Sequence, residues 1–132
     1  MEISDYIKPG ISREQTIAVI EEHTAAHVGS GSLRVLATPW MIAFMEKNSR
    51  IMLDEYLPEG YSTVGVLVNV RHLAPSAVGS TVRVTAEVKS VEGSKVTLEV
   101  AAWDGEEQIG SGTHERFVID VERFLKRVSK EK

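Results

Sequence analysis

The sequence predicts a fold of the α+β class, in which one antiparallel sheet packs against one long helix. Apolar residues recur at helical spacing between residues 39 and 57, whereas from residue 63 onward they alternate with polar residues. Turn-forming residues separate these segments, and the helical segment precedes the strands instead of lying between them. Strands that follow one another without intervening helices favour an antiparallel sheet over the parallel sheet of βαβ units.

The composition is that of an ordinary globular protein, and it excludes several kinds of function. The chain has 132 residues, a formal net charge of −4 and no cysteine. This length fits a single domain, residues 1–132. Without cysteine there is no disulfide, no thiolate metal site and no cysteine nucleophile, and neither a metal nor a cofactor is expected. The acidic balance argues against a nucleic-acid partner, and the lack of an apolar run of about 20 residues argues against a membrane. A cytoplasmic location is expected.

The first 30 residues carry the weakest pattern. Gln15–Val19 fits a strand, and Glu21–Val28 fits either an extension of that strand or a short helix. The run Gly29-Ser30-Gly31-Ser32 that follows indicates a loop.

A helix is predicted from about Pro39 to Leu57. Thr38 is a favourable N-cap residue, and Pro39 suits the first helical position, where no backbone N–H is needed. Pro58 and Gly60 end the pattern. The positions at helical spacing are Met41, Phe44, Met45, Asn48, Ile51, Met52 and Tyr56. This stripe is wide, so we expect most of the helix to be covered by other elements.

Four strands follow, and we predict them to form a meander. Apolar residues occupy the even positions of residues 64–70, before His72, and again of residues 82–88 and 96–102. Such alternation is typical of an antiparallel sheet with one face on a core. Residues 92–94 and 104–105 fit hairpin turns, and a fourth strand spans about Glu107–Ile119. A short amphipathic helix follows, with Val121, Phe124, Leu125 and Val128 on one face.

The economical packing lays the helix across the apolar face of the sheet. An open sheet has edge strands with unpaired backbone groups, and such an edge invites pairing with a second copy. A homodimer or a higher homo-oligomer is therefore expected.

Two titratable residues interrupt these apolar patterns. Glu46 lies in the middle of the helix. It fits either a solvated helix face or a carboxylate at the rim of a buried groove, where it would serve as a general base. His72 ends the row of valines on its strand, and it fits either a hydrogen-bonded structural residue or a site residue.

Other candidates lie at the start of the helix and in the last strand. Thr38 is sufficiently explained as a cap, but it also stands where the N–H groups of Trp40 and Met41 would stabilise negative charge. Gly112 weakens its strand, which indicates the close approach of a backbone or a ligand. Arg116 shares that strand face, and it fits either a carboxylate-binding residue or a surface ion pair.

Four stretches of the sequence stand out together: Val35-Leu36-Ala37-Thr38 with Met41 and Met45-Glu46, Gly65 with Val70-Arg71-His72, Val78-Gly79-Ser80-Thr81-Val82 with Val88-Lys89-Ser90-Val91-Glu92-Gly93, and Ile109-Gly110-Ser111-Gly112-Thr113-His114-Glu115-Arg116. Together they resemble the hotdog-fold acyl-CoA thioesterases, in particular their fluoroacetyl-CoA thioesterase branch. The likeness runs from about Leu33 to the C-terminus, and the last stretch is its most specific part.

The resemblance implies a hotdog fold, in which the sheet wraps around one long central helix, and an obligate dimer. It also implies hydrolysis of a small acyl-CoA thioester to the free acid and CoA. The family's catalytic threonine, glutamate and histidine correspond to Thr38, Glu46 and His72, which are the expected catalytic residues. Its glycine near the thioester and the arginine of its last strand correspond to Gly65 and Arg116. Together with Trp40 and Gly112, these two are the expected substrate-binding residues.

Two positions depart from this branch. Pro39 stands where its members tend to have glycine, which removes one backbone N–H. Ser32 lies near the position of an aromatic lid linked to fluoroacetyl selectivity, and it is not aromatic. These departures argue against fluoroacetyl-CoA itself as the substrate, and they leave the acyl group and the choice between CoA and an acyl carrier protein open.

The spacing of the candidates constrains the mechanism. Thr38 and Glu46 are eight residues apart, about 12 Å along a helix axis, so their side chains cannot meet within one helix. Either the three residues act at separate points of a long substrate, or a two-fold dimer brings Glu46 of one copy towards Thr38 of the other. In the composite site, Thr38 and backbone N–H groups polarise the thioester carbonyl. Glu46 attacks that carbonyl or activates water, and His72 positions Thr38 or protonates the departing thiolate.

Two other functions compete with hydrolysis. A non-catalytic acyl- or CoA-binding hotdog dimer fits the presence of Pro39 and the missing lid. A hotdog acyl-CoA hydratase would carry an aspartate–histidine pair in a D-x-N-P-x-H setting, and the sequence contains no such stretch.

Overall fold

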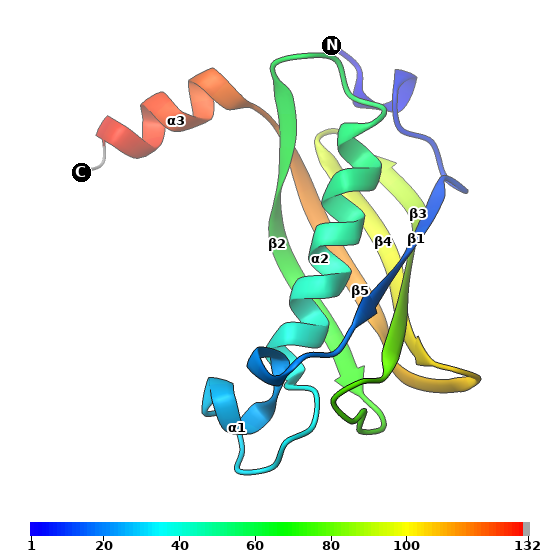
Figure 1. Ribbon diagram of the computed structural model, residues 1–132. Helices are drawn as coiled ribbons and strands as arrows, with labels where there is room; N and C mark the ends of the chain where they lie inside the picture. The colour runs from blue at the N-terminus through cyan, green and yellow to red at the C-terminus, as the bar shows by residue number, and fades with distance from the viewer. Residues whose placement is uncertain (131–132) are drawn as a thin grey trace.

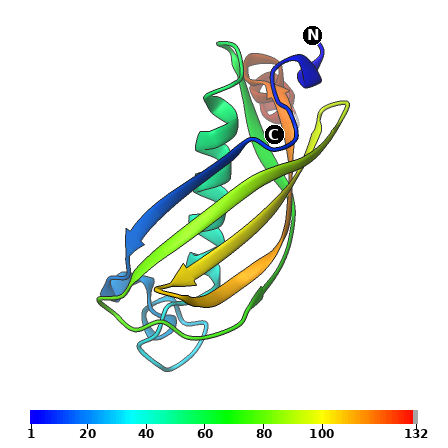
Figure 2. The ribbon, with the colours of Figure 1, turned by 90° about the vertical axis from the view of Figure 1, so that its right-hand side faces the viewer.

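A curved antiparallel sheet wraps around one long helix in the computed structural model, which describes residues 1–130 (Figure 1). The strands are β1 (Ser12–Ala18), β2 (Tyr61–His72), β3 (Thr81–Glu92), β4 (Lys95–Asp104) and β5 (Glu107–Asp120), and the helices are α1 (Ala25–Val28), α2 (Thr38–Asp54) and α3 (Val121–Lys130). Short 3-10 turns span Ile3–Asp5 and Glu21–His23. The predicted α+β class and the predicted packing are confirmed, because the strands run diagonally across one side of α2 (Figure 2). Residues 131 and 132 of the predicted domain lie outside the described part.

The order of the strands differs from the predicted meander. The sheet runs β1-β3-β4-β5-β2, so β2 pairs with β5 and has no contact with β3 in the ladder. The place beside β3 is taken by β1, from the pair Ser12–Glu87 to the pair Ala18–Thr81. Alternation of apolar residues reports which face a strand buries and carries no information on its neighbours, so the prediction of sequential pairing failed at β2.

The alternation in β3 and β4 is confirmed. All eight of the predicted inward residues are almost completely buried, namely Val82, Val84, Ala86, Val88, Val96, Leu98, Val100 and Ala102. They form one wall of the core and face α2.

The prediction for β2 is wrong at the beginning of the strand. A β-bulge between Gly65 and Leu67 shifts the register. Before the bulge, Gly65 lies opposite the buried Arg116. Val64 lies opposite Phe117, a residue that is 42% exposed on the outer face. The bulge inserts one residue and so reverses the alternation, with the result that odd positions face α2 before it and even positions face α2 after it.

A buried asparagine joins β1 to the apolar stripe of α2. Asn48 accepts a hydrogen bond from the Arg13 guanidinium at 2.7 Å, and its side-chain amide donates to the Arg13 carbonyl at 2.9 Å. Because both ends of the amide are paired, a polar side chain is tolerated among Met41, Met45 and Met52, which are almost fully buried.

The beginning of α2 corrects the predicted cap. The N-cap residue is Ala37, which makes no side-chain capping bond, and Thr38 is already helical. The Ala37 carbonyl accepts the N–H groups of both Trp40 and Met41 at 3.1 Å. The Thr38 hydroxyl is directed to His72, so a tertiary contact replaces the local cap that the sequence predicted.

The predicted C-terminal helix is present as α3, which extends away from the sheet at the end of β5 (Figure 1). Leu125 and Val128, on its predicted apolar face, are exposed in the single chain. Among the described residues, no helix is both long and apolar enough to cross a membrane.

Two glycines of β5 give a matched test of close packing. A Cβ at Gly112 would overlap the Asn69 carbonyl oxygen and would lie 2.6 Å from Cα of Val70, both backbone atoms of β2. A Cβ at Gly110 would lie 2.6 Å from Sδ of Met41, which sits at the end of a flexible side chain. The close approach predicted at Gly112 is therefore made by a backbone, which gives this residue a packing role, and its expected substrate contact stays a prediction.

We predict that Gly112→Ala lowers the free energy of unfolding by about 3 kcal/mol or more, because β2 and β5 must separate. Gly110→Ala should cost about 1 kcal/mol, since the Met41 side chain can move. Urea unfolding of both variants tests the difference. Equal losses would show that the backbone of β2 does not set the requirement at Gly112.

Candidate active site

Thr38 and His72 meet where α2 begins and β2 ends. The hydroxyl oxygen of Thr38 lies 2.8 Å from Nδ1 of His72. Both residues line a cavity of about 340 Å³, together with Leu36, Leu73 and Pro75. The two predicted residues are thus brought together beside a space that can hold part of a ligand.

The imidazole of His72 is partly buried, and this burial lowers its pKa. Near neutral pH the ring is therefore uncharged, with one nitrogen donating and the other accepting. Its Nε2 atom is buried without a hydrogen-bond partner among residues 1–130. A neutral ring can hold the Thr38 hydroxyl in position and still exchange a proton.

Glu46 lies in the middle of α2 and faces the buried end of Arg116. Its Oε2 is 3.8 Å from an Arg116 nitrogen, and the Glu46 side chain is 40% exposed against 7% for that of Arg116. A Cβ at Gly65 would lie only 2.8 Å from this carboxylate oxygen. The structure therefore brings Glu46, Arg116 and Gly65 together, and the glycine leaves the space that the carboxylate needs.

Arg116 is held by two residues that the sequence reasoning missed. Its Nε donates to the Thr63 hydroxyl at 2.8 Å, and a second nitrogen donates to the Thr63 carbonyl at 3.0 Å. The third nitrogen lies 3.1 Å from Nε2 of His114. The signal for His114 was its place two residues before Arg116 on the same strand face. The sequence pattern did not point to Thr63, because the bulge in β2 reverses the alternation that predicts which face of the sheet a residue occupies.

The contacts of His114 fix its protonation. A guanidinium only donates, so Nε2 of His114 accepts from Arg116. Nδ1 lies 2.7 Å from the Leu67 carbonyl, so it carries the proton. The ring is accordingly neutral, and burial, with a further contribution from Arg116, lowers its pKa.

The two groups of residues lie apart along α2. Eight residues separate Thr38 from Glu46, about 12 Å along the axis, and the cavity beside Thr38 and His72 is not lined by Glu46. One chain therefore holds a threonine–histidine pair and a glutamate–arginine pair as two half-sites.

The predicted backbone donors at the helix start are not available to a ligand. The N–H groups of Trp40 and Met41 are both bonded to the Ala37 carbonyl. The Trp40 ring instead packs on His23 and Phe44, with ring centroids 4.6 Å and 5.8 Å away. Of the groups expected to polarise a carbonyl, the Thr38 hydroxyl remains.

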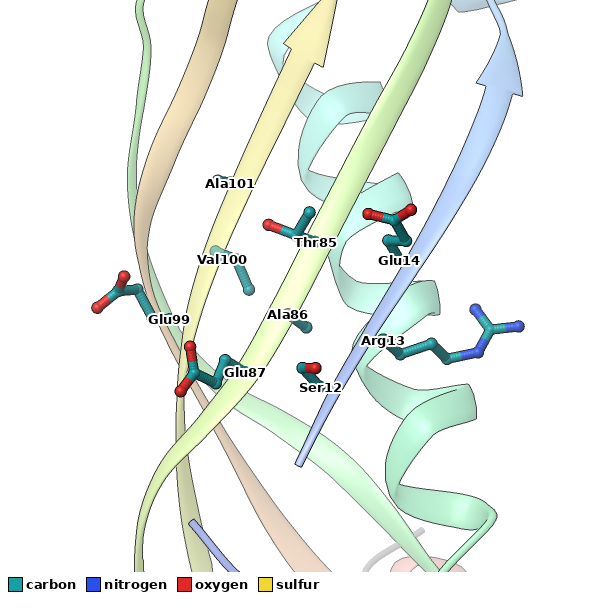
Figure 3. A pocket seen from close by; sticks show the side chains of 9 residues that line it. All are labelled: Ser12, Arg13, Glu14, Thr85, Ala86, Glu87, Glu99, Val100 and Ala101. Atoms are coloured by element: carbon teal, nitrogen blue, oxygen red, sulfur yellow. The ribbon is translucent and has the colours of Figure 1, made fainter. Parts of the chain in front are cut away.

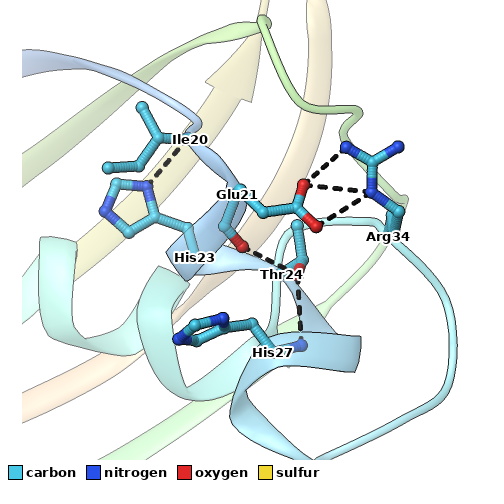
Figure 4. A network of polar contacts seen from close by, with 6 residues as sticks. All are labelled: Ile20, Glu21, His23, Thr24, His27 and Arg34. Carbon is cyan, nitrogen blue, oxygen red and sulfur yellow. Dashed lines mark hydrogen bonds and ion pairs between the residues drawn. The ribbon is translucent and has the colours of Figure 1, made fainter.

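The segment before α2 is ordered by local polar contacts (Figure 4). Glu21 forms a forked ion pair with Arg34, and the Thr24 hydroxyl donates to the Glu21 carbonyl and caps α1 by accepting from His27 N–H. These contacts close the loop over residues 29–34, whose Ser30 lines the cavity beside Thr38.

A second depression, of about 360 Å³, lies on the outer face of the sheet over β1, β3 and β4 (Figure 3). Its carboxylates are paired: Glu14 with Arg83, and both Glu87 and Glu99 with Lys89. None of the predicted site residues lines it.

Comparisons with known proteins agree on fold and family. A family model described as fluoroacetyl-CoA-specific thioesterase matches residues 19–122. The fluoroacetyl-CoA thioesterase of Streptantibioticus cattleyicolor is 44% identical over 94 residues, which are 71% of this chain and 68% of that protein.

Solved structures give the same answer. A mutant of the fluoroacetyl-CoA thioesterase in complex with acetyl-CoA has a TM-score of 0.89 at 34% identity, over 96% of this chain and 99% of that one. A hot-dog-like protein from Thermanaerovibrio acidaminovorans has a TM-score of 0.91 at 29% identity, over 99% of this chain and 97% of that one. The predicted hotdog fold is confirmed.

The neutral state of the buried histidines predicts a pH dependence of stability. In the unfolded chain histidine takes up a proton below about pH 6.5, whereas the lowered pKa of His114 and His72 keeps the folded rings neutral to lower pH. Protonation then favours the unfolded state, so stability present above pH 6.5 is lost as the pH falls. Each pKa unit between the two states is worth about 1.4 kcal/mol.

We predict that urea unfolding of the wild type shows this loss between pH 7 and pH 5, and that His114→Gln shows a smaller one. Each protein is compared with itself at the two pH values, so a lower stability of the variant at pH 7 does not affect the comparison of the two losses. An equal fall in both proteins would contradict the assignment to His114.

Proposed function

The chain belongs to the family of fluoroacetyl-CoA-specific thioesterases, and on that premise we propose that it hydrolyses a small acyl-CoA to the free acid and CoA in a site shared by two copies. Membership of the family establishes an acyl-CoA thioesterase of the hotdog class. The observation that carries the site assignment is the hydrogen bond between Thr38 and His72 at the wall of a cavity.

The proposed assembly is a homodimer joined through β2, in the cytoplasm, where CoA thioesters are found. β2 is an edge strand, paired on one side only, with β5. Its central residues Val66, Leu67 and Val68 are 52%, 41% and 39% exposed in the single chain. Unpaired backbone beside exposed apolar side chains supports pairing with a second copy.

The dimer would unite the two half-sites. Two-fold symmetry that sets two α2 helices side by side brings Glu46 of the partner subunit towards Thr38 and creates two equivalent sites. The 12 Å separation of the half-sites within one helix supports this arrangement over a site within one chain.

In the proposed reaction, the Thr38 hydroxyl donates a hydrogen bond to the thioester carbonyl oxygen, and neutral His72 orients that hydroxyl. Glu46 of the partner subunit either takes a proton from water as the water adds to the carbonyl carbon, or adds to that carbon itself. The C–S bond then breaks, the carbonyl re-forms, and CoA leaves as a thiolate. In the first route the thiolate takes the proton held by Glu46, and in the second route it takes a proton from solvent. In the second route, water afterwards releases the acid from the glutamyl anhydride.

Arg116 and Gly65 act on Glu46 in this proposal. Arg116 is fixed by Thr63 and His114, so its guanidinium offers the carboxylate a rigid partner at 3.8 Å. Gly65 keeps the space beside the carboxylate open. The substrate is proposed to be a small acyl-CoA other than fluoroacetyl-CoA, given Pro39 and Ser32 at two positions that depart from the branch.

Thiol release from a panel of acyl-CoA thioesters tests the activity. We expect Glu46→Gln to lower kcat at least about 100-fold, with a much smaller change in KM, because the carboxylate acts in the chemical step. The matched control is Glu106→Gln, in an exposed turn, which should keep the wild-type rate. If Glu46→Gln leaves kcat unchanged, Glu46 takes no part in the mechanism. If the wild type binds an acyl-CoA tightly without releasing thiol, the protein is a binding protein.

Mixing two inactive variants tests the composite site. In a heterodimer of Thr38→Ala and Glu46→Gln chains, one site carries both changes and the other carries neither. Half of randomly mixed dimers are heterodimers, so we expect about a quarter of wild-type activity to return. A site built within one chain would regain nothing, and a monomer in light scattering would also exclude it.

A further inference from the structure

A third cavity lies between β1 and the face of α2 opposite Thr38. Its volume is about 410 Å³, within the range of small-molecule pockets. Ile17 of β1 lines one side, and the other side is a single stripe of α2 that runs from Trp40 to Lys47. The cavity shares no lining residue with the one beside Thr38 and His72. A ligand held here therefore does not occupy the proposed thioester site.

The apolar part of the lining is held in place by ring contacts. The His23 ring lies 4.6 Å from the Trp40 ring and 5.0 Å from the Phe44 ring, and the Trp40 and Phe44 rings lie 5.8 Å apart. These rings pack directly on one another, so each limits the rotation of the others and no ligand ring enters between them. Together with Ile17 and Ala43 they form a fixed apolar surface, along which a hydrocarbon chain can lie.

His23 brings one hydrogen-bond donor to this cavity. Its Nδ1 accepts the Ile20 N–H at 3.1 Å (Figure 4), so the ring is neutral and its proton is on Nε2. Only 8% of His23 is exposed, and its Nε2 has no hydrogen-bond partner among residues 1–130. That Nε2 is nevertheless not fully enclosed. A nearly buried N–H without a partner costs free energy, which an acceptor on a ligand would recover.

Lys47 brings a positive charge to the same cavity. It lies one turn beyond Phe44 on the stripe, and long side chains on a helix lean towards its N-terminus, which fits the place of Lys47 in the lining. The side chain is exposed, and no carboxylate of the described residues forms an ion pair with it. The cavity thus combines an apolar wall with an N–H donor and an unpaired cation.

We propose that this cavity binds a monocarboxylic acid with a short apolar chain. The chain lies on the aromatic surface, one carboxylate oxygen accepts from Nε2 of His23, and the other faces the Lys47 ammonium group. A carboxylate suits these two groups because it only accepts hydrogen bonds and carries one negative charge. A cationic ligand would be repelled by Lys47, and a neutral one would gain nothing from its charge. Binding of the acid does not depend on the proposed hydrolysis, although that reaction also releases an acid.

Titration with hexanoate and with hexanamide, its neutral counterpart, tests the requirement for charge. Trp103 is replaced by Phe in the otherwise unchanged chain, so that Trp40 is the remaining tryptophan and its emission reports on the cavity. We expect hexanoate to change this emission and to bind about tenfold more tightly than hexanamide, because hydrogen bonds to charged groups are the stronger ones. High salt should weaken the preference, since Lys47 is exposed.

Variants of the lining locate the binding. Lys47→Gln should reduce the preference for hexanoate over hexanamide about fivefold, the upper value for an exposed ion pair. The matched control is Lys126→Gln, which removes an exposed positive charge from α3 and should leave the preference unchanged. Ala43→Leu should prevent the binding of both ligands by filling the cavity, whereas Thr38→Ala should not affect it.

The proposal would be overturned by the absence of any emission change with hexanoate or by equal affinity for the two ligands. An unchanged preference in Lys47→Gln would also overturn it, and this exposed substitution leaves the core intact if Ala43→Leu fails to fold. Loss of hexanoate binding in Thr38→Ala would place the acid in the cavity beside His72 instead. No thioester is turned over in these titrations, so a failure of the proposed hydrolysis leaves their outcome unaffected.

Discussion

The buried guanidinium of Arg116 is the constraint on which the arrangement around Glu46 depends. A charge inside a fold is tolerated only when its donors are paired, and three elements supply the partners: β2 through Thr63, β5 through His114, and α2 through Glu46. The guanidinium in turn constrains the residues around it. The guanidinium fixes the tautomer of His114. Gly65 leaves space for both charged groups, because a Cβ there would lie 2.8 Å from the Glu46 carboxylate and 3.3 Å from the Arg116 head. A single charged group thus links the middle of the helix to the far edge of the sheet.

The bulge in β2 makes the two half-sites compatible. Thr63 and Gly65 face the helix side before it, and His72 faces that side after it, although their positions are odd and even. In a regular strand of period two, either Thr63 or His72 would point outward. The inserted residue resolves this conflict, and it also leaves Val66, Leu67 and Val68 exposed at the sheet edge where a second copy is proposed to pair. The irregularity thus serves the site and the interface together.

The sequence predicts those parts of the structure that depend on local patterns. The alternation of β3 and β4 and the period of α2 are carried by runs of apolar residues, and the structure confirms them except at Tyr56, which lies beyond the end of α2 at Asp54 and is 47% exposed. Features that depend on contacts between residues far apart in the sequence were not predicted. Thr38 resembled a cap because its neighbours fit one, yet its hydroxyl is bonded to His72, 34 residues away. The bulge left no trace in the sequence except Gly65, and the one sign of a role for His114 was its place two residues before Arg116. The periodicity of apolar residues does not show which strands are neighbours, and the predicted meander therefore placed β2 beside β3 instead of β5.

The side chains that α2 contributes to the site point in different directions around the helix axis. At 3.6 residues per turn, Glu46 lies roughly 80° around the axis from Thr38, and Trp40 lies roughly 200° away. The face of Thr38 meets β2, the face of Glu46 meets Arg116, and the face of Trp40 meets His23 and Phe44. Substitutions on the Trp40 face therefore leave the groups proposed for bond breaking untouched. A fold organised in this way can vary one face of its central helix without disturbing the proposed chemistry on the other two.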